Sequence, residues 1–456
     1  MSAQVTVMKF GGTSLEDGEA FQRVARIVDA NVSANLVVVV SAMSGVTDAL
    51  IGSFQRAAKG ETAEALQTLE HHFERHLKVT STLGATASER MRAVIERSRR
   101  EIIELLGDVS TSRKTTAEGQ DAMASHGERL SANLLTIVLE GYGIPASYVD
   151  ARRCIITNTV HGSAEPFIEE TWRQTRAELQ PLLETKRVPV LGGFIAGARN
   201  RVTTTLGRGS SDYSATLFSA ALGARETQIW TDVDGVMTAD PCLVKSARTV
   251  SQLSYEEAAE LARLGAGVLH SKMIQPVIEQ KIPIRILNSR APKRGGTLIC
   301  AGAETTNTAV MAIAHKTNLT GINITSTPAF VANGFLGSIR NIFDRHRTRM
   351  YIVAMSEVGI SFACEEPVPL PSLVHDLQQV GSVETKSQRA IIGCVGEGLQ
   401  SLESTAKLRD ILRDIDHALT WHRTSRLSLI SMVDVNLVGP VVRQIHQGLF
   451  LSEPPS

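Results

Sequence analysis

Three short segments of this 456-residue chain combine glycine, hydroxyl-bearing and charged residues in ways that could handle phosphate. In the first, Lys9 stands near the end of an apolar stretch and is followed by Gly11, Gly12 and a helical pattern. Free backbone amides at a helix N-terminus favour a bound anion, and an ammonium group adds a positive charge. Taken alone, however, a glycine pair of this kind is more commonly a tight turn beside a surface lysine.

The second segment, Thr203–Asp212, is dense in glycine and hydroxyl groups and leads into an alanine-rich helical pattern that ends before Gly223. Gly223 is a natural residue to end that helix. Arg208 could hold a carboxylate or a phosphate through two parallel hydrogen bonds. A helix-capping role would account for Asp212 but not for Arg208 or the three threonines, so a functional interpretation is favoured.

The third segment, Trp230–Met237, is a strand pattern that closes in Thr231 and Asp232 and continues into a turn. Parallel sheets commonly bind nucleotides at the carboxyl ends of their strands, although a turn-rich loop explains the segment as well. Neither a P-loop motif, a complete GxGxxG nor a GxSxG nucleophile motif is present. His72 and His76 are interpreted as part of a solvated helix face rather than as zinc ligands.

These segments require an alternation of strands and helices to position them. Residues 4–10 alternate like a strand, residues 15–32 have helical periodicity with Ser14 and Asp17 as an N-cap signature, and residues 36–40 form an aliphatic run typical of a strand covered on both faces. Residues 53–140 are mostly helical in pattern and charged, and we expect them to form a helical excursion from the sheet. Further strands are expected at 146–149, 188–191, 228–231 and 282–287, so residues 1–300 are predicted to form one α/β domain.

The pattern changes after residue 300. Residues 301–308 are small and polar and are predicted to form a linker, and residues 309–456 contain two similar strand-then-helix patterns. The strand patterns are Ser356–Phe362 and Ser431–Leu437, and each is followed by a proline-containing turn and a helical stretch. We therefore predict two similar units in tandem.

The amino-acid composition argues against some classes of partner and indicates the cellular compartment. Lys and Arg number 47, as do Asp and Glu, and this balance argues against nucleic acid or an anionic membrane as a partner. The five cysteines are scattered and form no CxxC pair, which favours a reducing compartment. The chain has no apolar run long enough to cross a bilayer near its N-terminus, so a cytoplasmic protein is expected.

Taken together and in this order, the motifs resemble those of the aspartate kinases within the amino-acid kinase family, and residues beyond 300 resemble tandem ACT domains. The resemblance implies an α/β fold, namely an amino-acid kinase three-layer sandwich followed by two ACT-like α+β (ferredoxin-like) units. It also implies transfer of phosphate from ATP, with Mg²⁺, to the side-chain carboxylate of L-aspartate. The matching motifs are KFGGTS (9–14), VVVVSAMSGVT (37–47), SHGE (125–128), GGFIAG (192–197), TTTLGRGSSDYSA (203–215), TDVDGVMTADP (231–241) and LGAGVLH (264–270).

The resemblance also assigns roles to residues. It implies that Lys9 and Asp212 are catalytic, that Arg208 grips the α-carboxylate of aspartate and that Glu128 holds its ammonium group. Other positions match residues that shape the substrate pocket, namely Ser41, Thr47, Phe194 and Ser211. The implied ATP-binding residues are Lys9, Gly11, Gly12, Ser14, Thr231, Asp232 and Met237. The implied effector-binding residues are Asn333, Phe335, Leu336 and Ser356. No protein ligand for a metal is implied.

Several positions depart from the family pattern, and they keep alternatives open. The family commonly has tyrosine at Met237, a basic residue at Cys242 and lysine at Gly267, so contacts to the nucleotide are altered. One alternative is a kinase for another acidic amino acid, and another is a catalytically weak regulatory subunit that binds amino acids. The resemblance further implies lysine or threonine as effector and a homodimer or dimer of dimers.

Overall fold

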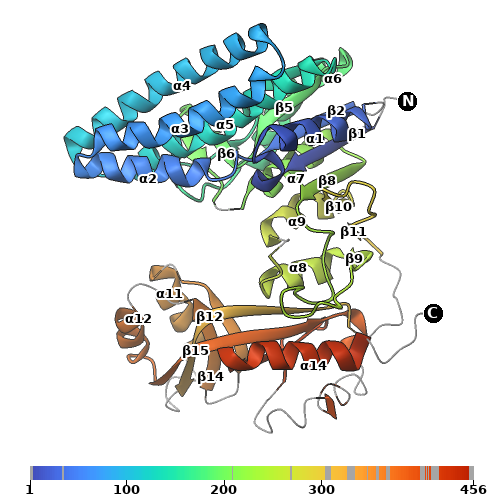
Figure 1. Cartoon of the computed structure of the whole chain (residues 1–456). Coiled ribbons are helices and arrows are strands. Elements are labelled where there is room, and N and C mark those ends of the chain that lie inside the picture. The colour runs from blue at the N-terminus through green and yellow to red at the C-terminus, as the bar shows by residue number, and fades with distance from the viewer. Residues whose placement is uncertain are drawn as a thin grey trace. The chain divides into compact units, whose positions relative to one another are not determined.

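The computed structural model describes residues 4–450 except 33–34, 208, 268–269, 303–309, 326–333, 347, 356–358, 366–369, 401–405, 407, 409 and 412–420. The chain packs into two units (Figure 1). Unit 1 comprises Met1–Gly235 and His270–Ala301, and unit 2 comprises Val236–Leu269 and Gly302–Ser456. The packing of Val236–Leu269 with the C-terminal residues was not predicted from the sequence. Most of the expected linker, residues 303–308, lies outside the described residues.

The described residues of unit 1 form a largely parallel sheet in which its strands have the order β3-β5-β2-β1-β8-β10-β11. The pairs from β3 to β10 are parallel, and β11 runs antiparallel to β10. Its strands are β1 (Val5–Phe10), β2 (Asn35–Val40), β3 (Ala146–Val149), β5 (Val188–Gly192), β8 (Glu226–Thr231), β10 (Ile284–Asn288) and β11 (Thr297–Cys300). A smaller sheet contains β4 (Ile156–Thr157), β6 (Ile195–Ala198) and β7 (Thr203–Thr205). The expected strands are therefore confirmed to within a few residues.

Helices cover both faces of the main sheet, which explains why its central strands are aliphatic on both sides. Met8 and Phe10 of β1 share one hydrophobic core with α1 (Gly18–Asp29) and α5 (Ala117–Gly141). Helix α7 (Ser211–Leu222) packs on β1 and contacts both α6 (Ile168–Glu184) and α9 (Ser271–Ile278). Helix α1 begins after Asp17, whose side chain accepts a hydrogen bond from Ala20 N at 2.9 Å, so the predicted cap at Ser14 was wrong.

The helical excursion forms a bundle of four helices, drawn in blue to teal in Figure 1. They are α2 (Val46–Lys59), α3 (Thr62–Ser81), α4 (Ala85–Ser112) and α5. His76 is fully buried in α3, and its Nδ1 lies 2.7 Å from His72 O. The interpretation of this stretch as a solvated face was therefore wrong for His76. Burial lowers its pKa to about 4, which keeps the ring neutral.

The described residues of unit 2 include a sheet with the strand order β13-β14-β12-β15-β17-β16. Its strands are β12 (Ala312–Thr325), β13 (Met350–Met355), β14 (Gly359–Glu365), β15 (Ser382–Val395), β16 (His422–Arg423) and β17 (Ser428–Asp434). Its helices are α8 (Tyr255–Arg263), α11 (Phe335–Arg345), α12 (Leu370–Leu377) and α14 (Val438–Phe450), and β9 (Gln252–Ser254) precedes α8. The order β12-α11-β13-β14-α12-β15 is the ferredoxin-like βαββαβ arrangement.

The two expected strand-then-helix patterns are present as β14 followed by α12 and β17 followed by α14. The two halves of the sheet share β12 and β15, each of which is 14 residues long. One core lies under α11 and α12 and another under α14. The core under α14 includes Ala239 and Val244, and this explains why the segment Val236–Leu269 belongs to unit 2.

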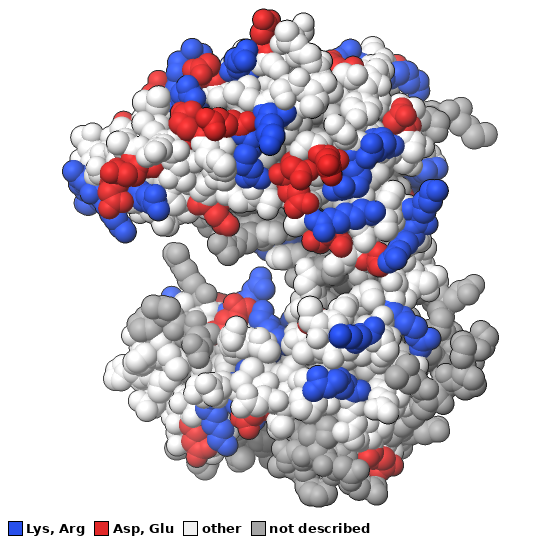
Figure 2. Space-filling model, viewed as in Figure 1, with Lys and Arg blue, Asp and Glu red and all other residues white. Residues whose placement is uncertain are grey.

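The surface carries a mixture of charges. On the face drawn in Figure 2, lysine and arginine side chains are interspersed with aspartate and glutamate side chains over the described residues. Within the described part of the chain, no helix is long and apolar enough to cross a membrane.

Candidate active site

The end of β1 brings a lysine and an aspartate into direct contact. Because neighbouring strand residues point to opposite faces, Lys9 points away from the core that holds Met8 and Phe10. On that side α7 begins, and Asp212 lies in its first turn. Lys9 Nζ is 2.6 Å from Asp212 Oδ1, and their side chains are only 11% and 16% exposed. The ion pair therefore sits at a helix N-terminus, where backbone amides favour a bound anion.

The turn after β1 joins the ends of several strands. Gly11 N donates to Trp230 O of β8 at 3.1 Å, and Ser14 Oγ lies 2.8 Å from Ser289 Oγ. Ser289 N donates in turn to Thr231 O at 2.8 Å. The predicted nucleotide residues around Gly11, Ser14 and Thr231 thus meet at the carboxyl end of the sheet. Ser289 follows β10 and has no sequence motif that identified it.

Glu128 lies in the buried middle of α5. Its Oε1 accepts a hydrogen bond from Ala42 N at 3.2 Å, and its Oε2 is buried with no hydrogen-bond partner among the described residues. Gly127 makes this approach possible, since a Cβ there would lie 2.8 Å from Ala42 Cβ. Burial raises the pKa of Glu128 to about 8, although the Ala42 amide opposes the shift. A buried carboxyl with an unsatisfied oxygen is suited to a cationic group of a ligand.

The segment after β5 lies against the start of α7. A Cβ on Gly193 would be 2.7 Å from Ser211 Cβ, so only glycine allows this close approach. Phe194 has a positive φ of 66°, and its amide donates to Ser214 Oγ at 2.9 Å. A non-glycine residue held in this region is strained and commonly belongs to a functional site. The predicted pocket residues Phe194 and Ser211 are thus brought together.

Two further predicted pocket residues lie beyond β2. Ser41 directly follows the strand, and its amide donates to Phe10 O at 3.1 Å. Thr47 lies in the first turn of α2. Arg208 lies outside the described residues, between the described Gly207 and Gly209. The structure therefore brings the strand ends together but leaves the position of the predicted arginine as a prediction.

The remaining nucleotide residues follow β8. Thr231 Oγ1 donates to Asp232 Oδ1 at 3.2 Å. Nearby, Asp234 accepts a hydrogen bond from Asn288 Nδ2 at 2.7 Å and forms an ion pair with Arg294. Neither Asn288 nor Arg294 was predicted as a site residue. Met237 belongs to unit 2, where it forms a β-bridge with Thr249. Among the described residues, no group of three or more His, Cys, Asp or Glu side chains could hold a metal ion.

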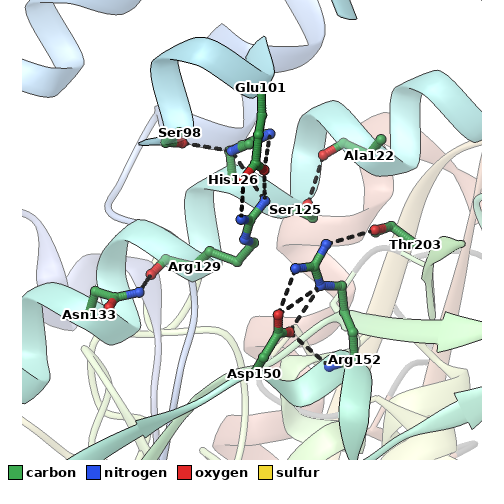
Figure 3. A network of polar contacts seen from close by, with 10 residues as sticks. All are labelled: Ser98, Glu101, Ala122, Ser125, His126, Arg129, Asn133, Asp150, Arg152 and Thr203. Carbon is green, nitrogen blue, oxygen red and sulfur yellow. Dashed lines mark hydrogen bonds and ion pairs between the residues drawn. The ribbon is translucent and has the colours of Figure 1, made fainter. Parts of the chain in front are cut away.

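A polar network whose contacts were not predicted from the sequence lies on the same helix as Glu128 (Figure 3). His126 Nδ1 is 2.6 Å from Ser98 Oγ, and the Arg129 guanidinium forms two hydrogen bonds with Glu101 at 2.7 and 3.2 Å. Burial and the Arg129 charge lower the pKa of His126 to about 3, so the ring is neutral. The network ties α5 to α4, and buried polar residues within an otherwise apolar helix were the available signal.

The predicted effector residues that can be described lie at the start of α11. Phe335 is partly buried against the core under α11 and α12, whereas Leu336 is 41% exposed. Asn333 and Ser356 lie outside the described residues. A pocket of about 560 Å³ runs along β13 within unit 2. It is lined by Glu260, Arg263, Met350, Ile352, Val353, Ala354, Met355, His422, Arg423 and Thr424.

Comparisons with known proteins show the family to which the chain belongs. Residues 4–288 match the amino acid kinase family. The chain is 30% identical to lysine-sensitive aspartokinase 3 of Escherichia coli over 98% of this chain and 100% of that protein. It is 32% identical to the chloroplastic aspartokinase 1 of Arabidopsis thaliana, over 98% of this chain and 80% of that protein.

Solved structures give the same result. E. coli aspartokinase III in complex with aspartate and ADP superposes with a TM-score of 0.86 at 29% identity, over 98% of this chain and 100% of that one. The same protein in complex with lysine and aspartate gives a TM-score of 0.80, over 98% and 99% of the two chains. Because the family match covers more than half of the chain and these relatives match it along nearly its whole length, the chain belongs to the amino acid kinase family and, within it, to the aspartokinases.

Proposed function

We propose that this chain uses ATP to phosphorylate the side-chain carboxylate of L-aspartate, giving 4-phospho-L-aspartate, the first step toward lysine, threonine and methionine. The observation that carries the proposal is the ion pair of Lys9 and Asp212, 2.6 Å apart at the N-terminus of α7. Phosphoryl transfer depends mainly on positioning and on neutralising the charge of the transferred group, and this arrangement can supply both.

In the proposed reaction, an oxygen of the substrate carboxylate attacks the γ-phosphorus of ATP, the bond to the bridging oxygen breaks, and ADP leaves. Lys9 neutralises negative charge on the transferred group, and the amides at the start of α7 add to this effect. Asp212 holds the ammonium group of Lys9 in place. Gly11, Gly12 and Ser14 supply the turn against which the phosphates lie.

Recognition of the amino acid requires opposite charges at its two ends. We assign the ammonium group of aspartate to Glu128, whose buried Oε2 has no partner among the described residues. We assign the α-carboxylate to Arg208. The residues proposed to shape the pocket between them are Ser41, Thr47, Phe194 and Ser211.

ATP use agrees with family membership, and we assign the nucleotide to Thr231, Asp232 and Met237 besides the turn after β1. Mg²⁺ is proposed as the ion that accompanies ATP, where it would neutralise phosphate charge. It needs only one or two protein carboxylates beside phosphate oxygens, and the exposed Asp232 offers a suitable oxygen donor.

Regulation is assigned to unit 2. We propose that its ACT-like halves bind lysine or threonine near Asn333, Phe335, Leu336 and Ser356, and that the protein acts as a homodimer or dimer of dimers in the cytoplasm. The pocket along β13 supports this assignment, because it adjoins the strand that leads to Ser356.

The proposal is tested by incubating the full chain with Mg-ATP and L-aspartate, trapping the acyl phosphate with hydroxylamine, with and without lysine and threonine. Aspartate-dependent hydroxamate that one of the two amino acids suppresses is the expected result. Product with glutamate but not aspartate would favour a kinase for another acidic amino acid. Binding of lysine or threonine without turnover of any acceptor would favour a regulatory subunit.

A further inference from the structure

One arginine of α3 connects the helical bundle to the turns that follow the central strands. Arg75 Nη1 donates a hydrogen bond to Ser44 O at 2.9 Å, and its Nη2 donates to Glu16 O at 2.9 Å. Glu16 belongs to the segment between β1 and α1, and Ser44 belongs to the segment between β2 and α2. A single guanidinium group therefore joins the segments that follow two neighbouring parallel strands.

The contacts of Arg75 are unusual for a charged side chain in this bundle. Within the described part of the chain it takes part in no ion pair, and its third contact is His72 Nδ1 at 3.1 Å. A guanidinium group can only donate, so the His72 ring has to accept. Burial and the charge of Arg75 lower the pKa of His72, which favours the neutral ring that can do so. The rigid fork of Arg75 is thus used to fix backbone geometry and not to neutralise a carboxylate.

The two segments that Arg75 joins also touch directly. A Cβ on Gly12 would lie 3.1 Å from Ala42 O, so the glycine turn packs closely against the start of the other segment. Glu16 is held a second time, because its side chain forms an ion pair of 2.9 Å with Arg290, which follows β10. The position of the turn after β1 is therefore set by its neighbours at the ends of β2 and β10 and by Arg75 of α3.

We infer that Arg75 is a positioning residue, which holds the proposed phosphate-binding turn at a set distance from the proposed amino-acid pocket. The turn contains Gly11 and Gly12, and the other segment contains Ser41 and leads to Thr47 at the start of α2. Transfer between two bound reactants is sensitive to small errors in their relative position. This inference rests on the proposed function and extends it to α3, a helix that supplies no residue to the proposed site.

The first test is the steady-state kinetics of Arg75→Met in the full chain, measured by hydroxamate formation. Each half of the site keeps its own residues and only their spacing changes, so we expect kcat to fall about tenfold or more while the KM values for ATP and aspartate stay within about threefold. Arg75→Lys should be nearly as slow, because one ammonium group does not reproduce the fork that bridges two carbonyl groups.

The matched control is Arg99→Met. Arg99 is a half-buried arginine of α4 in the same bundle, and it forms ion pairs with Glu70 and Glu96. Its loss should leave kcat within about twofold of wild type, even if it lowers the Tm, because exposed or half-exposed ion pairs contribute little and these do not touch the site. Equal losses of kcat in the two variants would show a general weakening of the bundle and would overturn the inference.

Chemical rescue separates the shape of the missing group from its charge. Added ethylguanidinium should restore part of the kcat of Arg75→Ala, whereas ethylammonium at the same concentration should not. Equal restoration by the two cations would mean that only the positive charge matters, and this would overturn the inference.

A further measurement does not depend on turnover. In Arg75→Met, amide hydrogen exchange should become faster in residues 11–16 and 42–47, and in Arg99→Met it should stay as in wild type there. Unchanged exchange in both segments, or an unchanged kcat, would overturn the inference and leave the proposed function intact. If the wild-type chain made no hydroxamate with any acceptor, the proposed function would be wrong, and hydrogen exchange would still decide whether Arg75 holds the two segments. Should Arg75→Met fail to fold, Arg75→Lys gives the same comparison.

Discussion

Lys9 is the residue on which the proposed chemistry depends most directly. Its ammonium group is nearly buried against Asp212, so removing it leaves the transferred phosphoryl charge without its nearest cation. We expect Lys9→Met to lower kcat by about 10²- to 10³-fold, the effect typical of losing one preorganised charge-stabilising group. The measurement is hydroxamate formation at saturating ATP and aspartate. Lys78→Met, on the exposed face of α3, is the control and should keep the wild-type rate.

The buried carboxyl group of Glu128 should make kcat/KM for aspartate depend on pH. With a pKa of about 8 in the free protein, its carboxyl is largely protonated at neutral pH and pairs poorly with an ammonium group. We expect kcat/KM for aspartate to rise about tenfold per pH unit below pH 8 and to level off above it. Glu128→Gln should lower kcat/KM and abolish this rise between pH 6 and 8.5. A Gln variant that retained the rise would show that another group titrates.

The same carboxyl has a second, independent effect on stability. Its pKa is raised above the unfolded value of 4.5, so the folded state holds the proton more tightly. The stability that this provides is present below pH 4.5 and is lost as the pH rises toward 8. The Tm of ligand-free Glu128→Gln, relative to wild type, should therefore increase from pH 5 to pH 8.

The residues of the site were predictable to the extent that each carried its own local motif. Lys9, Gly11 and Asp212 were recognisable because a turn or helix start surrounds each of them in the sequence. Ser289 and Asn288 were not, because their partners lie 275 and 54 residues away. A polar residue inside a helix or after a strand looks ordinary until its distant partner is known.

At the scale of elements, the site depends on α7 lying directly against the segment after β5. Gly193→Ala would place a Cβ 2.7 Å from Ser211 Cβ, so α7 must shift. We expect a loss of about 1–3 kcal/mol in the free energy of unfolding and a higher KM for aspartate. Urea denaturation and steady-state kinetics measure the two effects.

Gly107→Ala is the matched control for that substitution. Gly107 lies on the exposed side of α4 with open space around its Cα, so alanine there should stabilise the protein by about 0.5–1 kcal/mol. Equal effects at the two glycines would contradict the close packing proposed for Gly193.

Helices and strands could be predicted from the sequence where a few neighbouring residues carry the pattern that identifies them. The aliphatic run of β2 and the glycine after α7 identified their elements from a few residues. The start of α1 was misplaced by three residues, since Ser14 and Asp17 both suit a cap and only the structure shows which side chain reaches a backbone amide. The burial of His76 depends on the packing of α3 within the bundle, which its own sequence does not reveal.

At the scale of the whole molecule, we expect unit 2 to bind the inhibiting amino acid and to have little effect on kcat in its absence. Leu336→Ala removes an exposed apolar side chain at the start of α11. We expect the concentration of lysine or threonine that gives half inhibition to rise at least tenfold, while uninhibited kcat stays within about twofold. Arg340→Ala, exposed on the same helix, should respond as wild type. Unchanged inhibition in Leu336→Ala would place the effector elsewhere.

The division of the chain was the least predictable feature. Local composition suggested a boundary near residue 300, but Val236–Leu269 packs with residues beyond 302 through Ala239 and Val244. Such contacts depend on the complete fold, so no window of sequence around residue 236 contains the information.

This non-local packing has a consequence for synthesis of the protein. Thr238 Oγ1 lies 2.9 Å from His446 Nε2, a partner 208 residues further along the chain. A ribosome that adds about 5–20 residues per second would deliver that partner about 10–40 s after Thr238. During that interval Ala239 and Val244 lack the helix that buries them, and the nascent chain has to carry an unfinished hydrophobic segment between two parts of unit 1. Changes in codon usage after residue 236, or in chaperone supply while those residues are translated, should therefore affect the yield of folded protein more than the same changes before residue 236.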